Sequence, residues 1–224
     1  AEKGFGVAVW NRHGDVTQAF RAGAGALQPR IVAADSLAAL VDALAPPRAI
    51  ILMVPAGPVV DEMIAALRPL LQPDDMIIDA GNANFHDTDR RMRDPAVGPF
   101  LGVGVSGGED GARHGPSIMA GGPKALWERV APILTAIAAR HQGVPCAAWM
   151  GEEGAGHFVK SVHNGIEYAD MQMIAEIYGI LRDGMGLGAG RISTLFDGWN
   201  NGALRSYLIE ITAAVARATD PVGG

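Results

Sequence analysis

Up to about residue 104, short apolar runs alternate with longer segments in which apolar residues recur at helical spacing. The short runs are apolar on both faces and end at Gly, Pro, Asn or Asp, which is typical of buried strands. They cover residues 5–10, 48–54, 75–79 and 99–105. The segments at 35–45 and 58–71 predict helices, opened by an Asp-Ser cap and by Pro58. This alternation predicts an α/β fold with a Rossmann-like, doubly wound and mainly parallel sheet.

The β pattern ends near residue 152. A further helix at 123–140 and a last strand at 143–150 precede that point. Beyond it, helical periodicity continues through one long segment and two shorter ones, at 155–183, 190–200 and 202–218. We therefore expect a partial Rossmann-like domain at 1–152 and the beginning of an all-helical domain at 153–224.

The long helical segment carries two stripes on different faces. The apolar stripe predicts a core-facing seam and consists of Phe158, Val162, Ile166, Ala169 and Met173. The polar stripe consists of Lys160, His163, Asn164, Glu167 and Tyr168. A solvated face is the ordinary explanation for a polar stripe, but such faces favour Glu, Lys, Gln and Arg over His, Asn and Tyr. The mixture therefore favours a binding or catalytic face.

Lys160 and Glu167 are seven positions apart, roughly 10 Å along a helix axis. This separation is too long for the usual helical ion pair but leaves room for a small substrate between an amine and a carboxyl group. A desolvated lysine can act as a base, and a buried glutamate can keep a proton and act as an acid. The pair is therefore a candidate for acid and base catalysis.

The composition narrows the class of protein. With 224 residues, 49% of them hydrophobic and 19% charged, the chain is long and apolar enough to bury a core. Its net charge of −6 provides no basic surface, so we expect neither nucleic acid nor a membrane as a partner. The lone Cys146 excludes an internal disulfide, and no signal peptide or membrane-spanning run is visible, so we expect a cytoplasmic protein.

Polar residues and small loops follow several predicted strands. Directly after the first strand come Asn11, Arg12 and His13. In dinucleotide-binding sheets an Arg at this point accommodates the 2′-phosphate of NADP, so the sequence favours NADP over NAD. The next two strands are followed by Val54-Pro55-Ala56 and by Gly81-Asn82, at the carboxyl edge where open α/β sheets bind ligands. Turn formation alone is the alternative explanation for the Gly-Asn pair.

A match to the glycine motif of dinucleotide-binding turns occurs at Gly102, Gly104 and Gly107. It follows a late strand and opens no clear helix, so the context of that motif is missing. We expect instead that 105–115 is a flexible loop whose N–H groups and Ser106 approach a ligand. The histidines and the cysteine show no metal-ligand spacing, so we expect no metal site.

Several long segments, in order, resemble the decarboxylating 6-phosphogluconate dehydrogenase family. They are "IIDAGNANFHDTDRR" (77–91), "GVSGGEDGARHGPSIMAGG" (104–122), "GAGHFVKSVHNGIEYADMQ" (154–172) and "DGWNNGALRSYLIEITA" (197–213). By this resemblance Lys160 is the general base and Glu167 the general acid. The implied substrate-binding residues are Asn82, Ser106, Gly107, Gly108, His163, Asn164 and Tyr168. The implied contacts of the cofactor NADP are Asn11, Arg12, His13, Val54, Pro55, Ala56 and Asn82.

The resemblance implies the oxidative decarboxylation of 6-phosphogluconate in the pentose phosphate pathway. Lys160 would remove the 3-hydroxyl proton while hydride passes from C3 to NADP, and the resulting β-keto acid would lose carbon dioxide. Glu167 would then protonate the enol carbon to give ribulose 5-phosphate. The full-length protein would be a homodimer, and residues 153–224 would begin the family's C-terminal helical domain.

The sequence also departs from the family's pattern. The family's first strand with its Gly-rich turn and its later helices are not in this sequence, so we expect a chain truncated at both ends. Pro55, Ala83 and His13 stand where the family usually has Lys, Ser, and Ser or Thr. Two alternatives therefore stay open: a non-catalytic binding or interaction protein, and a related β-hydroxyacid dehydrogenase with another substrate.

Overall fold

The computed structural model describes residues 1–219. The chain forms two compact units, Ala1–Ser161 and Val162–Gly224, and the division falls inside one helix. Within residues 1–219, no helix is long and apolar enough to cross a bilayer. The two units are described separately below.

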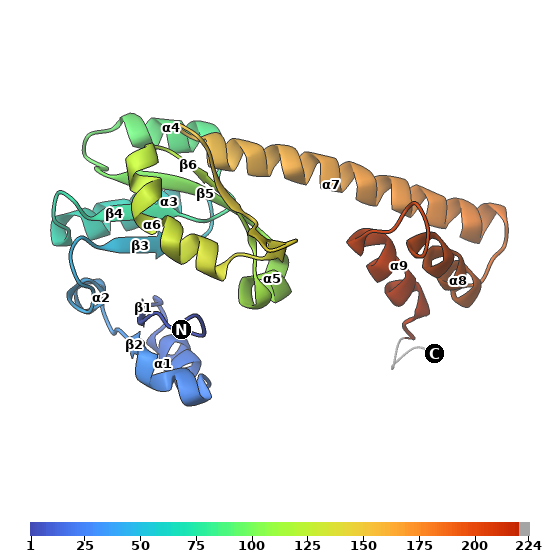
Figure 1. Cartoon of the computed structure of the whole chain (residues 1–224), viewed down its shortest axis with the longest axis horizontal. Helices are drawn as coiled ribbons and strands as arrows, with labels where there is room; N and C mark the ends of the chain where they lie inside the picture. Colours follow the sequence, from blue (N-terminus) through green and yellow to red (C-terminus); the bar gives the residue numbers. More distant parts are fainter. Residues whose placement is uncertain (220–224) are drawn as a thin grey trace. The chain divides into compact units, whose positions relative to one another are not determined.

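The first unit is built on a five-stranded sheet with the order β3-β4-β5-β6-β9 (Figure 1). The strands are β3 (Ala49–Leu52), β4 (Met76–Asp79), β5 (Phe100–Ser106), β6 (Ser117–Gly121) and β9 (Ala147–Gly151). β3, β4 and β5 are parallel, β6 runs antiparallel to β5, and β9 is parallel to β6. The predicted α/β fold with a mainly parallel sheet is confirmed, with one reversal at β6.

The central strands β4 and β5 are buried on both faces, which explains why they show no polar alternation. Ile77 of β4 belongs to one apolar cluster, which α3 (Pro58–Leu67) closes through Ile64. Met76 and Ile78 point to the other face, into a cluster that α6 (Lys124–Ile137) closes through Leu134. Alternate residues of one strand therefore supply two cores, one on each side of the sheet.

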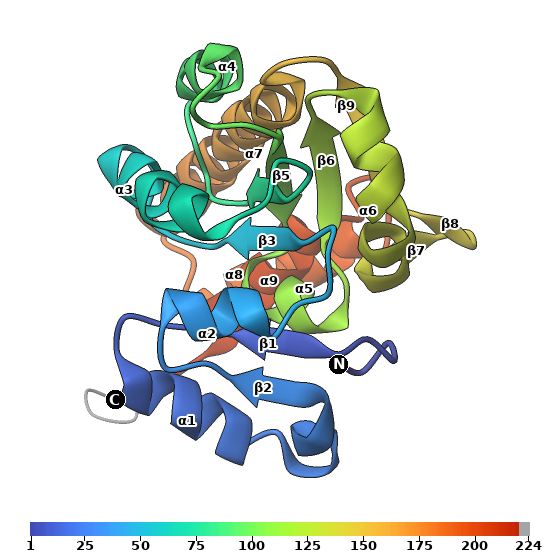
Figure 2. The same cartoon turned by 90° about the vertical axis from the view of Figure 1, so that its left-hand side faces the viewer.

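A second, two-stranded sheet lies near the start of the chain. β1 (Val7–Val9) pairs in parallel with β2 (Ile31–Ala33), and α1 (Gly14–Ala22) and η1 (Gly25–Arg30) connect them. Figure 2 shows the two strands side by side with α1 close to β2. The strand predicted at 5–10 is present in shortened form, whereas β2 and α1 were not predicted because their runs are short and carry weak periodicity.

The remaining elements of the first unit are short. They are α2 (Leu37–Asp42), η2 (Arg68–Leu70), α4 (Phe85–Arg93), α5 (Gly108–His114), β7 (Arg140–His141) and β8 (Val144–Pro145). Ser36 caps α2 by accepting a hydrogen bond from the Ala39 N–H, as the sequence predicts. The strand predicted at 143–150 divides into β8, which belongs to a small hairpin, and β9, which joins the sheet.

The prediction of a flexible loop at 105–115 is wrong for most of this segment, because residues 108–114 form α5. Gly107 and Gly108 adopt φ angles of 139° and 59°, which turn the chain sharply from β5 into the helix. Acidic residues in the first turn and basic residues in the last suit the helix dipole. These charges hold a helix that has too few apolar residues to show a helical period.

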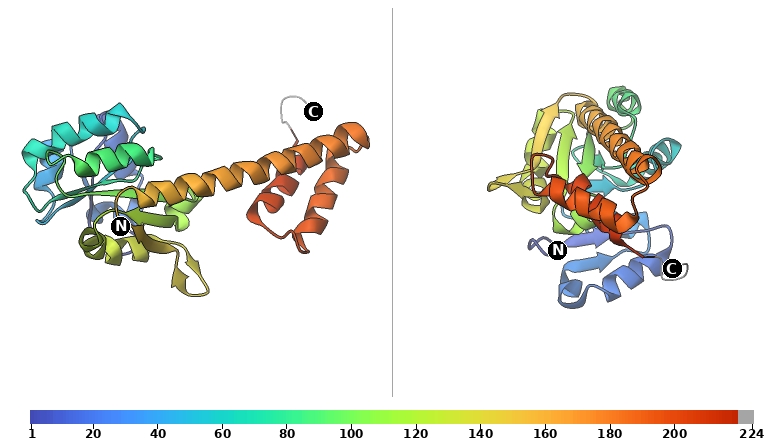
Figure 3. Two further views of the ribbon diagram at one scale, coloured as in Figure 1. Left: turned by 90° about the horizontal axis from the view of Figure 1, so that it is seen from above. Right: turned by 90° about the vertical axis from the view of Figure 1, so that its right-hand side faces the viewer.

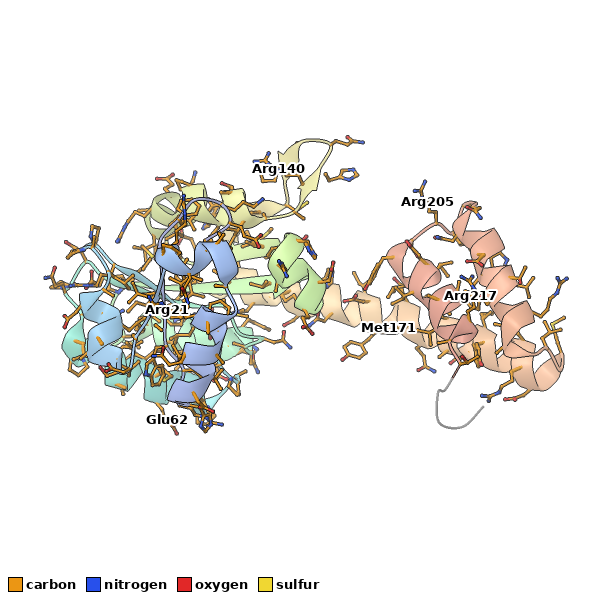
Figure 4. All side chains as sticks on the ribbon, turned by 90° about the horizontal axis from the view of Figure 1, so that it is seen from below. Arg21, Glu62, Arg140, Met171, Arg205 and Arg217 are labelled. Atoms are coloured by element: carbon orange, nitrogen blue, oxygen red, sulfur yellow. The ribbon has the colours of Figure 1, made fainter. Side chains whose placement is uncertain are left out.

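The second unit is entirely helical over its described residues. α7 (Ala155–Gly179) enters it and continues into a π-helical turn, η3 (Ile180–Gly184), followed by α8 (Ala189–Asn200) and α9 (Tyr207–Arg217). Figure 3 shows α8 and α9 packed together, and their core contains Ile192, Phe196 and Ile209. Arg217, labelled in Figure 4, pairs with Asp197 across these two helices. The predicted helix at 155–183 therefore spans α7 and most of η3.

The apolar stripe of α7 is not the core-facing seam that its spacing predicts. Phe158 and Ile166 are 49% and 61% exposed, and the other stripe members also lie on the surface of the described chain. Periodicity identifies an apolar face, but only a neighbouring element can bury it. Within the described residues, most of this stripe is therefore left exposed.

Candidate active site

The carboxyl ends of β3 and β4 bring two predicted cofactor-binding segments together. Val54, Pro55 and Ala56 follow β3, and Gly81 and Asn82 follow β4. A Cβ atom at Gly81 would lie only 3.0 Å from the Val54 carbonyl oxygen, so a glycine allows this close approach. The Gly81 N–H donates to Asp79 Oδ1 at 3.0 Å, and this hydrogen bond fixes the turn. The next residue, Asn82, is exposed.

Glycines on one face of β5 allow α7 to lie directly on the sheet. A Cβ atom at Gly104 would lie 2.5 Å from the Cβ of Lys160, and one at Gly121 would lie 2.3 Å from the Gly156 nitrogen. No larger residue fits at these positions, since real contacts between such atoms are longer. The Lys160 side chain of α7 therefore starts directly over Gly104, which lies two residues before Ser106 on the same face of β5.

Ser106, Gly107 and Gly108 form the turn between β5 and α5. Ser106 is half-buried, whereas the two glycines are exposed. Gly107 cannot be replaced without a clash, since a Cβ atom there would lie 2.9 Å from the Gly111 Cα. The structure thus places this predicted substrate loop and Lys160 near the end of the same strand, β5, in the first unit.

The polar stripe of α7 contains side chains that contact one another. His163 Nδ1 lies 3.3 Å from Asn164 Oδ1 and 3.6 Å from Glu167 Oε2. Lys160, His163, Asn164 and Glu167 are all half-buried, whereas Tyr168 is 70% exposed. A carboxylate next to an imidazole can exchange a proton with it or with a bound ligand, which suits an acid catalyst.

The turn after β1 holds the predicted cofactor residues Asn11, Arg12 and His13. The Arg12 Nε–H donates to His13 Nε2 at 3.1 Å, and the His13 N–H donates to Asn11 Oδ1 at 2.9 Å. All three residues are exposed, and Asn11 is tied to α1 because its N–H donates to the Thr17 hydroxyl at 3.0 Å. An exposed guanidinium next to an imidazole is a suitable surface for a phosphate group.

Sequence reasoning missed a buried ionic group beneath the carboxyl edge. Arg91 is fully buried, and its guanidinium donates to both carboxylate oxygens of Asp61, at 2.9 and 3.0 Å. Arg91 also donates to the Gly57 carbonyl and lies 3.6 Å from the buried Asp79 carboxylate. Hydrogen bonds from Arg91 and then Arg90 lower the pKa of Asp61 to about 2. This group joins α3, α4 and β4 below the Asn82 loop.

Sequence reasoning also missed His157, which lies one helical turn before Lys160. The ring is 1% exposed, and its Nδ1 lies 2.7 Å from the hydroxyl oxygen of the buried Thr88. Burial lowers the pKa of His157, against the opposing effect of Asp79. The sequence does contain one signal for His157. It lies three residues before Lys160, so both side chains lie on adjoining parts of one helix face.

The parallel sheet, the phosphate-compatible turn after β1 and the lysine that α7 holds against β5 fit a nicotinamide-dependent dehydrogenase fold. Residues 1–151 match the family model for the NAD binding domain of 6-phosphogluconate dehydrogenase, and residues 156–224 match the model for its C-terminal domain. The chain belongs to the 6-phosphogluconate dehydrogenase family.

Relatives of known name support this assignment over the whole chain. The chain is 49% identical to a decarboxylating 6-phosphogluconate dehydrogenase from Chlamydia pneumoniae, over 99% of this chain and 47% of the relative. It is 48% identical to an NAD(+)-dependent decarboxylating enzyme from Bacillus subtilis, over 100% of this chain and 48% of the relative. The chain thus spans about half the length of the curated relatives it matches.

Solved structures give the same result. The structure of 6-phosphogluconate dehydrogenase from Plasmodium falciparum superposes with a TM-score of 0.91 at 37% identity, covering 98% of this chain and 48% of that one. A Mycobacterium tuberculosis 3-hydroxyisobutyrate dehydrogenase superposes with a TM-score of 0.63 at 24% identity, over 90% of this chain and 72% of that one, which shows a shared fold only.

Proposed function

We propose that these residues belong to an enzyme that oxidises and decarboxylates 6-phosphogluconate, giving ribulose 5-phosphate, carbon dioxide and NADPH. The observation that carries the proposal is the position of Lys160, held by a glycine surface of β5 beside Ser106. The relative from Plasmodium falciparum is described with NADP+ and 6-phosphogluconate, which supports both ligands. The enzyme acts in the cytoplasm, and its complete form is a homodimer.

Each residue has a distinct task in this mechanism. Lys160, in its neutral form, accepts the proton of the 3-hydroxyl group, and Ser106 and Asn82 orient the carbon skeleton between the lysine and the cofactor. NADP, when bound, accepts the hydride from C3. After carbon dioxide leaves, Glu167 gives a proton to the enol carbon, and His163 at 3.6 Å helps to hold that carboxyl group in place.

We propose NADP rather than NAD as the cofactor. Arg12 and His13 lie exposed after β1 and together offer a cationic, hydrogen-bonding surface that fits a 2′-phosphate. The Bacillus subtilis relative is named as NAD(+)-dependent, so the family contains both preferences. Calorimetric titration with NADP and NAD decides between them, and tighter binding of NAD would contradict our assignment.

The assay uses the product of the complete reading frame that encodes these residues. We expect NADPH formation from 6-phosphogluconate with release of an equal amount of carbon dioxide. Lys160→Ala and Glu167→Ala should each lower kcat by about 10²-fold or more, since positioned acids and bases contribute about 10²–10⁴-fold. Near-normal rates in both variants would contradict the assigned roles.

A further titration and a substrate screen test the two alternative functions. In calorimetric titration, a non-catalytic binding protein would bind 6-phosphogluconate without binding NADP. A related β-hydroxyacid dehydrogenase would instead oxidise another hydroxy acid faster than 6-phosphogluconate in a substrate screen. The 3-hydroxyisobutyrate dehydrogenase shares only the fold, so no specific observation favours this second alternative.

A further inference from the structure

One buried hydrogen bond links two parts of the candidate site. Thr88 of α4 is 0% exposed and His157 of α7 is 1% exposed, and their Oγ1 and Nδ1 atoms lie 2.7 Å apart. Gly102 of β5 leaves the space that both side chains occupy, because a Cβ atom there would lie 2.5 Å from the Thr88 methyl group and 2.9 Å from His157 Nδ1. The pair is thus enclosed by α4, α7 and β5.

Each partner of this hydrogen bond leads to a residue of the site. The Thr88 hydroxyl also lies 3.4 Å from the Asn84 carbonyl oxygen, and Asn84 caps the start of α4, two residues after Asn82. His157 precedes Lys160 by three residues on α7. The contact therefore connects the loop that carries Asn82 to the helix turn that carries Lys160.

The surroundings of His157 affect the pKa of its ring and therefore its hydrogen bond to Thr88. Burial lowers the pKa of its ring, the buried Arg91 acts in the same direction, and the Asp79 carboxylate opposes both. The main-chain groups of Asp79 and Gly81 also face the ring and oppose the lowering of its pKa. The lowered pKa favours the neutral imidazole, whose Nδ1 can share one hydrogen bond with the Thr88 hydroxyl group.

We propose that Thr88 and His157 are positioning residues for the reaction, which set the distance between Asn82 and Lys160. This inference rests on the proposed function. In that reaction one carbon atom loses a hydride toward the cofactor and its hydroxyl proton toward Lys160. The two acceptors must therefore be held in one geometry, and a displacement of about 1 Å can cost about 10²-fold in rate. A contact between two side chains that are at most 1% exposed holds that geometry without touching substrate.

Thr88→Val is the central test, because valine keeps the branched shape of threonine and replaces only the hydroxyl group, with a methyl group. We expect kcat to fall by about 10- to 100-fold, while KM for 6-phosphogluconate and NADP changes by less than about 3-fold. Thr88→Ser keeps the hydroxyl group and should stay within about 3-fold of the unchanged protein in kcat. Equal kcat values for the two variants would overturn the proposal.

A second pair of variants tests the other partner. Asparagine places a polar group near the Nδ1 position of histidine, whereas glutamine places one near Nε2. We therefore expect His157→Asn to retain more kcat than His157→Gln. The reverse order would also overturn the proposal.

Val130→Ala controls for loss of stability alone. Val130 is 4% exposed and lies in the apolar cluster under α6, away from α4 and α7. It should lower the melting temperature at least as much as Thr88→Val and leave kcat within about 2-fold. A similar loss of kcat in both variants would show that Thr88 acts only through folding.

A readout without turnover separates this inference from the proposed function. In the 224-residue chain, the acetylation rate of Lys160 can be followed by mass spectrometry as a function of pH. We expect Thr88→Val to change this rate by about 3-fold or more, with Thr88→Ser unchanged. Equal rates in all three proteins would overturn the positioning role. If the product of the complete reading frame forms no NADPH, the proposed function fails, while the acetylation result on the 224-residue chain still stands.

Discussion

The contact between α7 and β5 predicts a sharp effect of a single methyl group. A Cβ atom at Gly104 would lie 2.5 Å from the Lys160 Cβ and 2.9 Å from the Gly156 carbonyl oxygen. Carbon atoms in ordinary contact are about 3.5–4.0 Å apart, so Gly104→Ala requires α7 to move by about 1 Å. The neighbouring atoms are backbone and Cβ atoms, which cannot rotate away.

This movement has a stability cost and a larger functional one. Overpacking of this kind costs about 1–3 kcal/mol, or roughly 2–4 °C of melting temperature for each kcal/mol in a domain of this size. A displacement of about 1 Å at the proton-accepting lysine can lower kcat by about 10²-fold. We therefore expect a protein that still folds at 25 °C but turns over very slowly.

The assay compares Gly104→Ala with Gly165→Ala on the same helix. A Cβ atom at Gly165 meets no atom within 4 Å, so alanine there should raise stability by up to about 1 kcal/mol through its higher helix propensity. Thermal unfolding and steady-state kinetics are measured for both. Normal stability and kcat in Gly104→Ala would refute the reasoning, because they would mean that α7 does not lie on β5 at this distance.

Two further predictions concern stability. The Asp61 carboxylate has a pKa of about 2 in the folded protein, below its ordinary 3.8, because Arg91 and Arg90 donate hydrogen bonds to it. Its contribution to the free energy of unfolding should therefore be complete above about pH 4 and be lost as the pH falls through about 2. Urea unfolding between pH 2 and 5 should show that the free energy of unfolding depends less on pH in Asp61→Asn. An unchanged pH dependence in this variant would contradict the prediction. In the second unit, the buried Ser193 hydroxyl donates to the Ala213 carbonyl at 2.9 Å, so Ser193→Ala should cost about 1 kcal/mol in urea unfolding, more than an exposed Thr194→Ala control.

Hydrophobic patterning predicted most of the regular structure. The buried strands and the longer helices were identified because a strand buried on both faces is continuously apolar and a long helix repeats its apolar residues. The short α5 was missed, since seven residues rich in glycine and charge show neither pattern. The seam on α7 was assigned to the core, although Phe158 and Ile166 are exposed.

By itself the sequence determined the family, the α/β architecture and the five polar residues that share a face of α7, because these depend on local periodicity and on long matching segments. Only the tertiary structure decided how Lys160 is held. That depends on glycines of β5 and β6, whose role is to leave space for a helix that lies far from them in sequence. The buried Thr88–His157 contact likewise joins residues 69 positions apart. A hydrogen bond between distant residues leaves no periodic pattern, so it becomes visible only when the chain is folded.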